Sequence, residues 1–311
     1  MGLSSPARED GIVVLAGGTG GAKLARGVAD AYGAESLTVI ANTGDDIEIY
    51  GAHVSPDPDL VCFWLAGKID ERGWGLAGDT FTVMDALREL GVDVWFNLGD
   101  RDLAWCMERA RMLAGGESPT EALARLGGAI GLRARVLPMS DEPVRTWVRT
   151  DASGWCAFQE FMIRERARGT IEGLEFRGAE RARPTAQALA AISVARVIVI
   201  GPSNPLASIG PILAVPGLEE ALRRAPAPVV AVSPIVGGEV LKGPTASFME
   251  HAGQRPHAAG VAAIYGDLLD GIVADEPVAG LPTLSTDTFM GDDAGRVRLA
   301  ERTLEFAQTL R

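Results

Sequence analysis

The stretch IVVLAGGTGGAKLARG, residues 12–27, decides the fold class of this chain. Residues 12–16 are apolar and mostly β-branched, which predicts a buried strand, and the glycines that follow predict a tight turn. Residues 22–31 carry apolar side chains at helical spacing, and residues 36–41 (SLTVIA) predict a second buried strand. Strand, glycine turn, helix and strand in this order open a doubly wound α/β sheet.

The same alternation of strands and helices continues along the rest of the chain. The sequence Ser118-Pro119-Thr120-Glu121 is a capping box with proline at the first helical position. Strands are predicted at 93–98, 134–137, 144–150, 196–200, 228–232 and 272–274. Helices are predicted at 81–90, 102–114, 119–130, 155–168, 184–192, 257–269 and 294–310, with one or two short helices in 208–224, broken at Pro216.

The predicted architecture is a Rossmann-like three-layer α/β/α fold with a mostly parallel sheet. We expect one domain over residues 11–311, with a smaller inserted helical and β region at about 115–180. Residues 1–10 (MGLSSPARED) have no apolar core and are predicted to be a flexible tail.

Composition excludes several classes of partner. The 311 residues include 29 Lys and Arg and 41 Asp and Glu, which gives a net charge of −12. No basic run interleaved with aromatic residues is present, so nucleic acid is not an expected ligand. No apolar run approaches membrane-spanning length, and the three cysteines show no CxxC spacing. We expect a cytoplasmic protein that meets an anionic ligand through local positive charge only.

The first candidate site is the glycine turn from Gly17 to Lys23. Bare backbone N–H groups after a strand, followed by the positive end of a helix, can bind a phosphate, and Lys23 can reach a phosphate oxygen. The run matches neither GxGxxG nor the P-loop pattern. The alternative is a turn that only lets a helix pack closely on a strand.

Two acidic loops form the next candidates. Asp45 and Asp46 follow the second predicted strand, at the sheet edge where open α/β folds bind ligands. Asp57 and Asp59 flank a proline in SPDPD. Mg²⁺ takes one or two protein carboxylates together with phosphate oxygens, so Asp45 with Asp57 or Asp59 would suit it. The alternatives are an Asx turn or helix cap for the first loop and a solvated turn for the second.

Two later turns complete the set. Arg101, in the sequence Gly99-Asp100-Arg101-Asp102, is a candidate for neutralising phosphate, with an ion pair to Asp100 as the alternative. Asp102 is predicted to be a helix N-cap. The turns 201–205 (GPSNP) and 208–211 (SIGP) offer donors and acceptors for a nucleoside, or they are turns alone.

Other catalytic schemes find little support. His53, His251 and His257 fit neither HExxH nor any other zinc motif, and no GxSxG elbow is present. A lone histidine such as His257 on a predicted helix is more often structural. The simplest remaining mechanism is one in which the protein positions the substrates and a metal ion neutralises their charge.

Eight motifs in order resemble the 2-phospho-L-lactate transferase family from about residue 12 to 275. They are GGTGGAKLARG, ANTGDDIEIYG, SPDPDLV, IDERGWGLAGDTF, NLGDRDLA, LPMSD, GPSNPLASIGPIL and SPIVGG. The glycine turn is also distantly similar to that of nucleotide-sugar-binding regulators of the same superfamily.

The resemblance implies a reaction and a cofactor. The family builds the deazaflavin carrier coenzyme F-420 from a guanosine diphosphate bearing lactate, enolpyruvate or glycerate. The acceptor is the terminal ribityl hydroxyl of 7,8-didemethyl-8-hydroxy-5-deazariboflavin, which attacks the distal phosphorus and releases GMP. Mg²⁺ is the expected cofactor, and a homodimer is common in resembling proteins.

The resemblance also implies roles for individual residues. Asp45 and Asp59 would bind Mg²⁺ or orient the attacking hydroxyl. Asp45, Trp74, Asp79 and Thr80 would contact the deazaflavin, although Gly78 replaces a bulkier residue of some members. The nucleotide and its phosphates would be bound by Gly17, Gly18, Thr19, Gly20, Gly21, Lys23, Arg101, Ser203, Asn204, Pro205 and Gly210.

Two other functions stay open at this point. A non-catalytic nucleotide-sugar regulator would explain the glycine turn but not the acidic pairs. A nicotinamide-dependent dehydrogenase is permitted by the glycine turn, but the fingerprint is imperfect and no convincing catalytic histidine accompanies it.

Overall fold

Seven parallel strands form the central sheet of the protein, in a computed structural model that describes residues 11–241 and 243–310. The predicted tail, residues 1–10, lies outside the described residues. The strands in spatial order are β14 (Thr283–Ser285), β13 (Gly271–Ala274), β10 (Val229–Val232), β9 (Val197–Ile200), β1 (Ile12–Ala16), β2 (Leu37–Ala41) and β5 (Arg135–Pro138). The Rossmann-like fold predicted from the glycine turn is confirmed.

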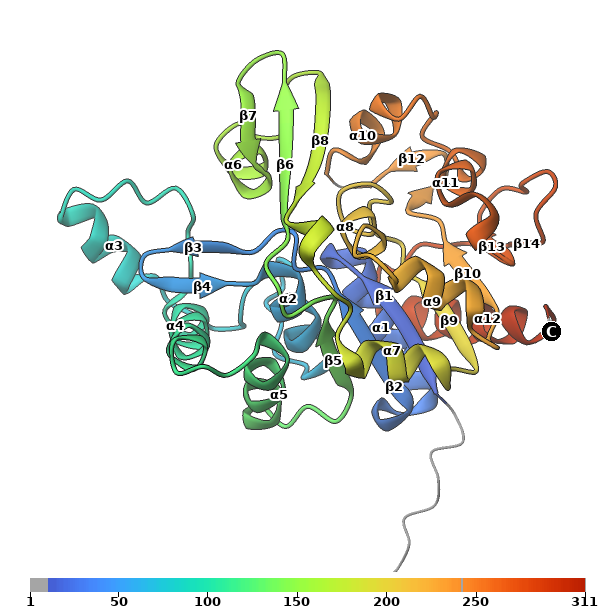
Figure 1. Ribbon diagram of the computed structural model, residues 1–311, viewed down its shortest axis with the longest axis horizontal. Helices are drawn as coiled ribbons and strands as arrows, with labels where there is room; N and C mark the ends of the chain where they lie inside the picture. Colours follow the sequence, from blue (N-terminus) through green and yellow to red (C-terminus); the bar gives the residue numbers. More distant parts are fainter. Residues whose placement is uncertain (1–10, 242, 311) are drawn as a thin grey trace, which may run out of the picture.

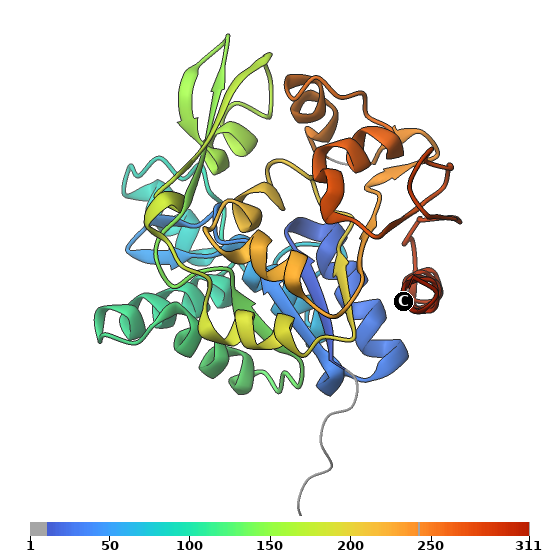
Figure 2. The ribbon, with the colours of Figure 1, turned by 45° about the vertical axis from the view of Figure 1, so that its right-hand side comes forward.

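The alternation of side chains along β1 divides the core into two layers. Ile12, Val14 and Ala16 belong to one apolar cluster, and Val13 and Leu15 belong to another on the opposite face of the sheet. All five are buried, because a parallel sheet is covered on both faces. Helices therefore pack on both sides, as Figures 1 and 2 show.

Different helices cover the two faces. The first face packs against α1 (Gly18–Tyr32), α2 (Pro56–Leu65), α4 (Asp100–Ala114), α5 (Pro119–Ala129) and α12 (Asp293–Gln308). The second packs against α7 (Ala186–Ser193), α8 (Gly210–Leu213), α9 (Leu218–Arg224) and α11 (Ala258–Tyr265). The predicted capping box of α5 is formed, and the break between α8 and α9 falls at the predicted proline.

A separate antiparallel sheet stands at one end of the molecule (Figure 1). It consists of β7 (Gly154–Ala157), β6 (Arg145–Thr150) and β8 (Ile171–Arg177), with α6 (Phe158–Ile163) packed beside it. The region predicted as an insertion, residues 115–180, thus contains this small sheet and also β5, which pairs with β2 in the central sheet.

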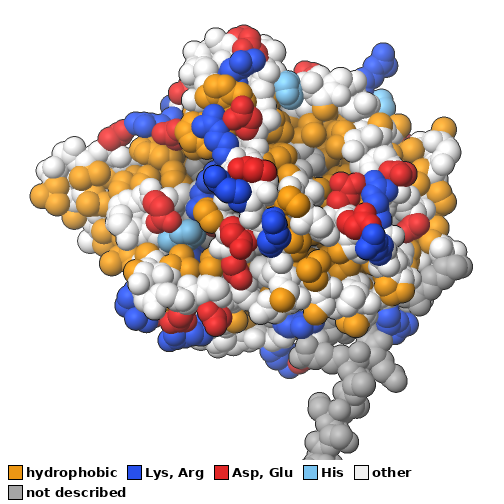
Figure 3. Space-filling model, viewed as in Figure 1, with side chains coloured by type: hydrophobic (Ala, Val, Ile, Leu, Met, Phe, Trp, Pro, Cys, Tyr) orange, Lys and Arg blue, Asp and Glu red, His pale blue; other side chains and the backbone are white. Residues whose placement is uncertain are grey.

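The remaining elements are short. They are β3 (Ile47–Ile49), β4 (Ala52–Val54), β11 (Ile235–Val236), β12 (Glu239–Val240), α3 (Thr82–Glu89), α10 (Thr245–His251) and the 3₁₀ turns η1 (Ala34–Ser36), η2 (Ala179–Arg181) and η3 (Gly266–Leu268). On the face shown in Figure 3, hydrophobic side chains gather over α3, where Val83, Leu90 and Val92 are exposed. Within the described ranges, no helix has both the length and the apolar character needed to cross a bilayer.

Two predicted elements are wrong. Residues 93–98 form no strand. Their aromatic and apolar side chains, Trp95, Phe96 and Leu98, line a cavity instead of covering a sheet. The helix predicted at 155–168 is shortened at both ends, because Cys156 pairs with Val148 in the β6–β7 hairpin. Arg166 and Ala167 have φ values of 54° and 52°, which no helix continues through.

Candidate active site

A cavity of about 1050 Å³ opens at the carboxyl edge of the central sheet. Its wall includes residues that follow five different strands: Gly17 after β1, Asp45 after β2, Pro202 after β9, Ser233 after β10 and Thr288 after β14. Loops at this edge of an open α/β sheet form ligand sites because the strands all end there. The volume is at the upper end of the range of small-molecule sites, about 300–1000 Å³.

The glycine turn forms one wall of the cavity. Gly17 is the N-cap of α1, and Gly18 begins the helix with a φ of 63°. The Gly17 N–H donates to Ser203 Oγ at 3.2 Å, and the Gly18 N–H donates to Asp57 Oδ1 at 2.7 Å. No acidic residue of α1 itself lies in its first turn, but the Asp57 carboxylate from a separate helix already faces the N-terminus of α1, which borders the cavity.

The same turn also packs closely, as the alternative interpretation from the sequence predicts. A Cβ on Gly20 would lie 2.0 Å from the Pro202 carbonyl oxygen, and one on Gly21 would lie 2.8 Å from the Ala16 Cβ. Gly20 and Thr19 line the cavity, whereas Gly21 does not. Glycine is thus required for the contact between helix and strand as well as for exposing the backbone.

Lys23 lines the cavity from the second turn of α1. Its Nζ donates to the Met290 carbonyl oxygen at 3.2 Å and lies 5.8 Å from the centre of the Trp64 ring. These contacts place the ammonium group in the cavity wall, on the same helix as the glycine turn.

Asp45 and Asp57 line the cavity, and neither carboxylate forms an ion pair with a basic side chain in the described part of the chain. Asp45 is 5% exposed, and its Oδ1 has no hydrogen-bond partner. Burial, followed by the negative charge of Asp57, raises the pKa of Asp45 well above its usual value. Burial also raises the pKa of Asp57 to about 6, although Asn42 and Gly18 donate hydrogen bonds to it.

Asp59 differs, because its charge is already neutralised. The Arg109 guanidinium is 3% exposed and pairs with both Asp59 oxygens, with Nη1 at 3.0 Å from Oδ2. Trp105 Nε1 donates to Asp59 Oδ1 at 2.7 Å, and Arg109 Nη1 also donates to the His53 carbonyl oxygen. The structure thus brings Asp45 together with Asp57, whereas Asp59, predicted as its partner in metal binding, faces an arginine.

The N-cap predicted for Asp102 is wrong. Helix α4 begins at Asp100 with Gly99 as the N-cap. The carboxylate of Asp79, far upstream, accepts the N–H of Arg101 at 2.9 Å and that of Asp102 at 3.1 Å. A side chain from a distant segment therefore caps this helix, and the carboxyl group of Asp102 is left to line the cavity.

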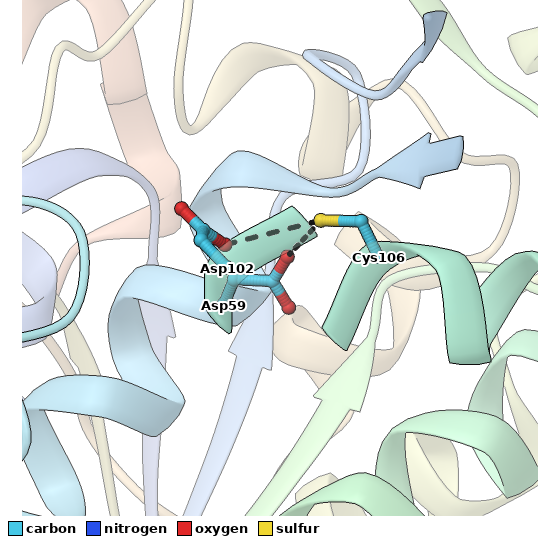
Figure 4. A group of neighbouring side chains, drawn as sticks. All are labelled: Asp59, Asp102 and Cys106. Carbon is cyan, nitrogen blue, oxygen red and sulfur yellow. Dashed lines mark hydrogen bonds between the residues drawn. The ribbon is translucent and has the colours of Figure 1, made fainter. Parts of the chain in front are cut away.

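The Asp102 carboxyl lies in a group with Asp59 and Cys106 (Figure 4). The Cys106 thiol donates to Asp102 Oδ1 at 3.9 Å. Burial, then the charges of Asp59 and Asp79, raise the pKa of Asp102 to about 7. Burial likewise keeps the thiol protonated by raising its pKa. With Asp59 also paired to an arginine, this group suits a divalent cation less well than Asp45 and Asp57 do.

Several predicted site residues lie outside the cavity lining. The Thr80 hydroxyl donates to Asp100 Oδ2 at 2.6 Å, and Arg101 has an exposed side chain. The predicted residues that do line the cavity are Gly17, Gly18, Thr19, Gly20, Lys23, Asp45, Asp59, Trp74, Ser203 and Asn204. Those outside it are Gly21, Asp79, Thr80, Arg101, Pro205 and Gly210.

The sequence interpretation missed most of the apolar wall. The cavity is also lined by Phe63, Trp95, Phe96, Phe158 and Met162. The apolar run at residues 93–98 is a signal of burial, but its pattern predicts a strand and not a cavity wall. A second missed segment, residues 288–291, follows the edge strand β14 and carries no recognisable pattern.

Comparisons with known proteins bear on what this cavity does. Residues 12–293 match the family model described as 2-phospho-L-lactate transferase CofD. The chain is 42% identical to a phosphoenolpyruvate transferase of Kitasatospora aureofaciens, with 96% of this chain and 98% of the relative covered. It is 39% identical to a 2-phospho-L-lactate transferase of Methanosarcina mazei, with 85% and 87% covered.

A solved structure shares the fold. A member of the UPF0052 family from Bacillus halodurans superimposes with a TM-score of 0.65 over 95% of this chain and 99% of that protein, at 17% identity. The family match favours a transferase over a non-catalytic regulator. The order of the motifs, the cavity at the carboxyl edge of the sheet and the match over residues 12–293 agree, and the chain belongs to the 2-phospho-L-lactate transferase CofD family, as an enzyme of that family.

Proposed function

We propose that this enzyme transfers a phospholactyl-type group, which is phospholactyl, phosphoenolpyruvyl or phosphoglyceryl, from a guanosine diphosphate donor. The acceptor is the ribityl hydroxyl of 7,8-didemethyl-8-hydroxy-5-deazariboflavin, GMP is released, and the product enters coenzyme F-420 biosynthesis. Family membership supports the reaction class, and the chemistry of the cavity wall supports the two substrates. We further propose that the enzyme is a cytoplasmic homodimer, as is common in resembling proteins.

The polar part of the wall suits the donor. The N-terminus of α1 and Lys23 supply positive charge for the diphosphate. The Asn204 Oδ1 accepts two backbone N–H bonds, from residues 206 and 207, and is therefore fixed, whereas its amide N–H₂ donates to no group among the described residues and can bind a ligand. Ser203, held against the Gly17 N–H, lies beside it in sequence.

The aromatic part of the wall suits the acceptor. Trp74, Trp95, Phe96 and Phe158 present large flat apolar surfaces to the cavity, which a tricyclic deazaflavin ring can contact. Trp74 is 49% exposed, and the Arg72 guanidinium lies 4.2 Å from the centre of its ring. An exposed tryptophan at a cavity mouth gains burial when a ring binds against it.

Asp45 and Asp57 fit Mg²⁺. Both are buried carboxylates, Asp45 Oδ1 has no hydrogen-bond partner, and the negative charge of Asp57 acts on Asp45. When bound, the ion offsets the charge of the phosphates and of these carboxylates. The protein itself positions the donor along the glycine turn and orients the acceptor hydroxyl, because hydrogen-bonded and packed side chains hold both walls.

The observation that carries this proposal is the buried Asp45 carboxylate, whose Oδ1 has no hydrogen-bond partner among the described residues, in a cavity that also holds the glycine turn and an aromatic wall. Incubation with the deazaflavin alcohol, Mg²⁺ and each of the three guanosine donors should release GMP and form a phosphodiester, which mass spectrometry detects. Asp45→Asn should lower turnover by about a hundredfold or more, since it removes a charge close to the reacting phosphate.

The matched control is Asp30→Asn on the exposed side of α1, which should retain wild-type turnover. No GMP and no phosphodiester with any donor would refute the transferase proposal. Unchanged turnover in Asp45→Asn would remove Asp45 from the mechanism. Comparing the three donors identifies the acid, which the differently named relatives leave open.

A further inference from the structure

Asn42 joins the two loops that carry the paired carboxylates. It follows β2 directly, is fully buried, and its N–H donates to the Ala16 carbonyl oxygen at 3.0 Å. This bond continues the pairing of β1 with β2 by one residue. The backbone of Asn42 is therefore anchored directly to the sheet.

Both ends of the Asn42 amide are used. Its Oδ1 accepts the Gly44 N–H at 2.7 Å, and its Nδ2 donates to Asp57 Oδ2 at 2.9 Å. An amide side chain is neutral and combines an acceptor with a donor, so it can close a turn and hold a carboxylate at the same time. An aspartate at this position would offer only acceptors when ionised.

The contacts fix both acidic residues. Asp57 is held at each oxygen, by Asn42 on one and by the Gly18 N–H on the other. Asp45 follows Gly44, where a Cβ would lie 2.5 Å from Thr146 Oγ1 and 2.9 Å from Asn42 Oδ1. The turn is thus tightly enclosed, and Asn42 determines where Asp45 enters the cavity.

We propose that Asn42 is a positioning residue that holds Asp45 and Asp57 at the spacing needed to bind a divalent cation. Two buried like charges repel each other, so their approach has to be imposed by the surrounding structure. Asn42 imposes this close approach on both carboxylates. Its Nδ2 donates a hydrogen bond to Asp57, and its Oδ1 closes the turn that leads to Asp45. This inference rests on the proposed function, because the cation is part of that function.

The variant Asn42→Ser separates this role from that of closing a turn. A serine hydroxyl can accept the Gly44 N–H in the same way as the amide oxygen does, but it is too short to reach Asp57. Mn²⁺ titration followed by electron paramagnetic resonance, on full-length protein without nucleotide, should show about tenfold weaker binding in the variant. The thermal midpoint in EDTA should change little. Asn42→Thr serves as the second variant if the first does not fold.

Ser55→Ala is the matched control. The Ser55 hydroxyl donates to Asp46 Oδ1 at 2.7 Å, so this variant also loses a hydrogen bond to a carboxylate in the same pair of loops. Its Mn²⁺ affinity should stay close to wild type. Equal Mn²⁺ affinity in Asn42→Ser and wild type, or an equal loss in Ser55→Ala, overturns the positioning role.

The outcomes separate this inference from the function on which it rests. If wild-type protein binds no Mn²⁺, the cation site and the positioning role fail together. If wild type binds Mn²⁺ and Asn42→Ser binds it weakly, the positioning role stands even where no transferase product is found.

Discussion

At the scale of single residues, Asp102 is a carboxyl whose surroundings favour its protonated form. Burial and the charges of Asp59 and Asp79 raise its pKa from 3.8 to about 7. The folded state therefore holds this proton more tightly than the unfolded state does. As the pH rises from the unfolded to the folded pKa, the unfolded chain loses the proton first, and the folded protein loses stability.

This predicts the effect of Asp102→Asn on stability. In EDTA, the wild-type unfolding free energy should contain a contribution that falls between about pH 4 and about pH 7, by up to about 4 kcal/mol. Urea unfolding of Asp102→Asn should show a shallower fall over this range, because the amide does not ionise. Asp30→Asn, on the surface of α1, should retain the wild-type slope. Equal slopes for wild type and Asp102→Asn would show that Asp102 does not titrate in this way.

At the scale of elements, the approach of α1 to the loop after β9 positions the glycine turn at residues 17–23. A Cβ on Gly20 would lie 2.0 Å from the Pro202 carbonyl oxygen, and backbone cannot rotate away as a side chain can. By contrast, Gly128 lies inside α5, and a Cβ there would meet no atom within 4 Å. Gly20 and Gly128 both lie in helices, but they differ in the space around them.

Alanine at the two positions should act in opposite directions. Gly20→Ala should destabilise the protein by about 2 kcal/mol or more, since α1 has to move from the loop. Gly128→Ala should stabilise it by about 0.5–1 kcal/mol, through helix propensity and a less flexible unfolded chain. Chemical denaturation measures both. A Gly20→Ala protein as stable as wild type would mean that the loop yields at little cost, and a destabilised Gly128→Ala would contradict the open space in α5.

At the scale of the whole molecule, the proposed function requires an acidic protein to admit an anionic donor. The net charge is −12, and the described cavity lining includes Asp45, Asp57, Asp59 and Asp102 but few basic side chains, such as Lys23. The positive charge of the buried Arg109 offsets the negative charge of Asp59. Long-range repulsion therefore opposes the approach of the donor, whereas the α1 terminus, Lys23 and a cation act only at short range.

This charge distribution predicts an unusual dependence on salt. The association rate of GDP, measured by stopped flow at fixed Mg²⁺, should rise several-fold between about 20 mM and about 200 mM salt, because screening weakens the repulsion. The dissociation rate should change less, since contacts within the cavity are screened less. An association rate that falls with salt would show that the local positive elements dominate the field at the cavity mouth.

Much of the fold could be predicted because its signals are local. The buried run before Gly17, the capping box at Ser118 and the proline break near 216 each act within one or two turns of chain, and each is confirmed. His257, interpreted as structural, accepts the Gly260 N–H at the start of α11. The errors at 93–98 and 155–168 have the opposite cause, since the fate of those apolar side chains depends on distant partners.

The candidate site shows the same difference between local signals and contacts with distant partners. Local sequence patterns are enough to predict which loops reach the carboxyl edge of the sheet, because strand and turn signals place Gly17, Asp45 and Ser203 there. How the carboxylates divide among their partners depends on the tertiary structure. Asp59 meets Arg109, Asp79 caps α4, and Asp57 joins Asp45 through Asn42. Charge pairing and hydrogen bonding depend on distances across the fold, and spacing along a single chain does not contain them.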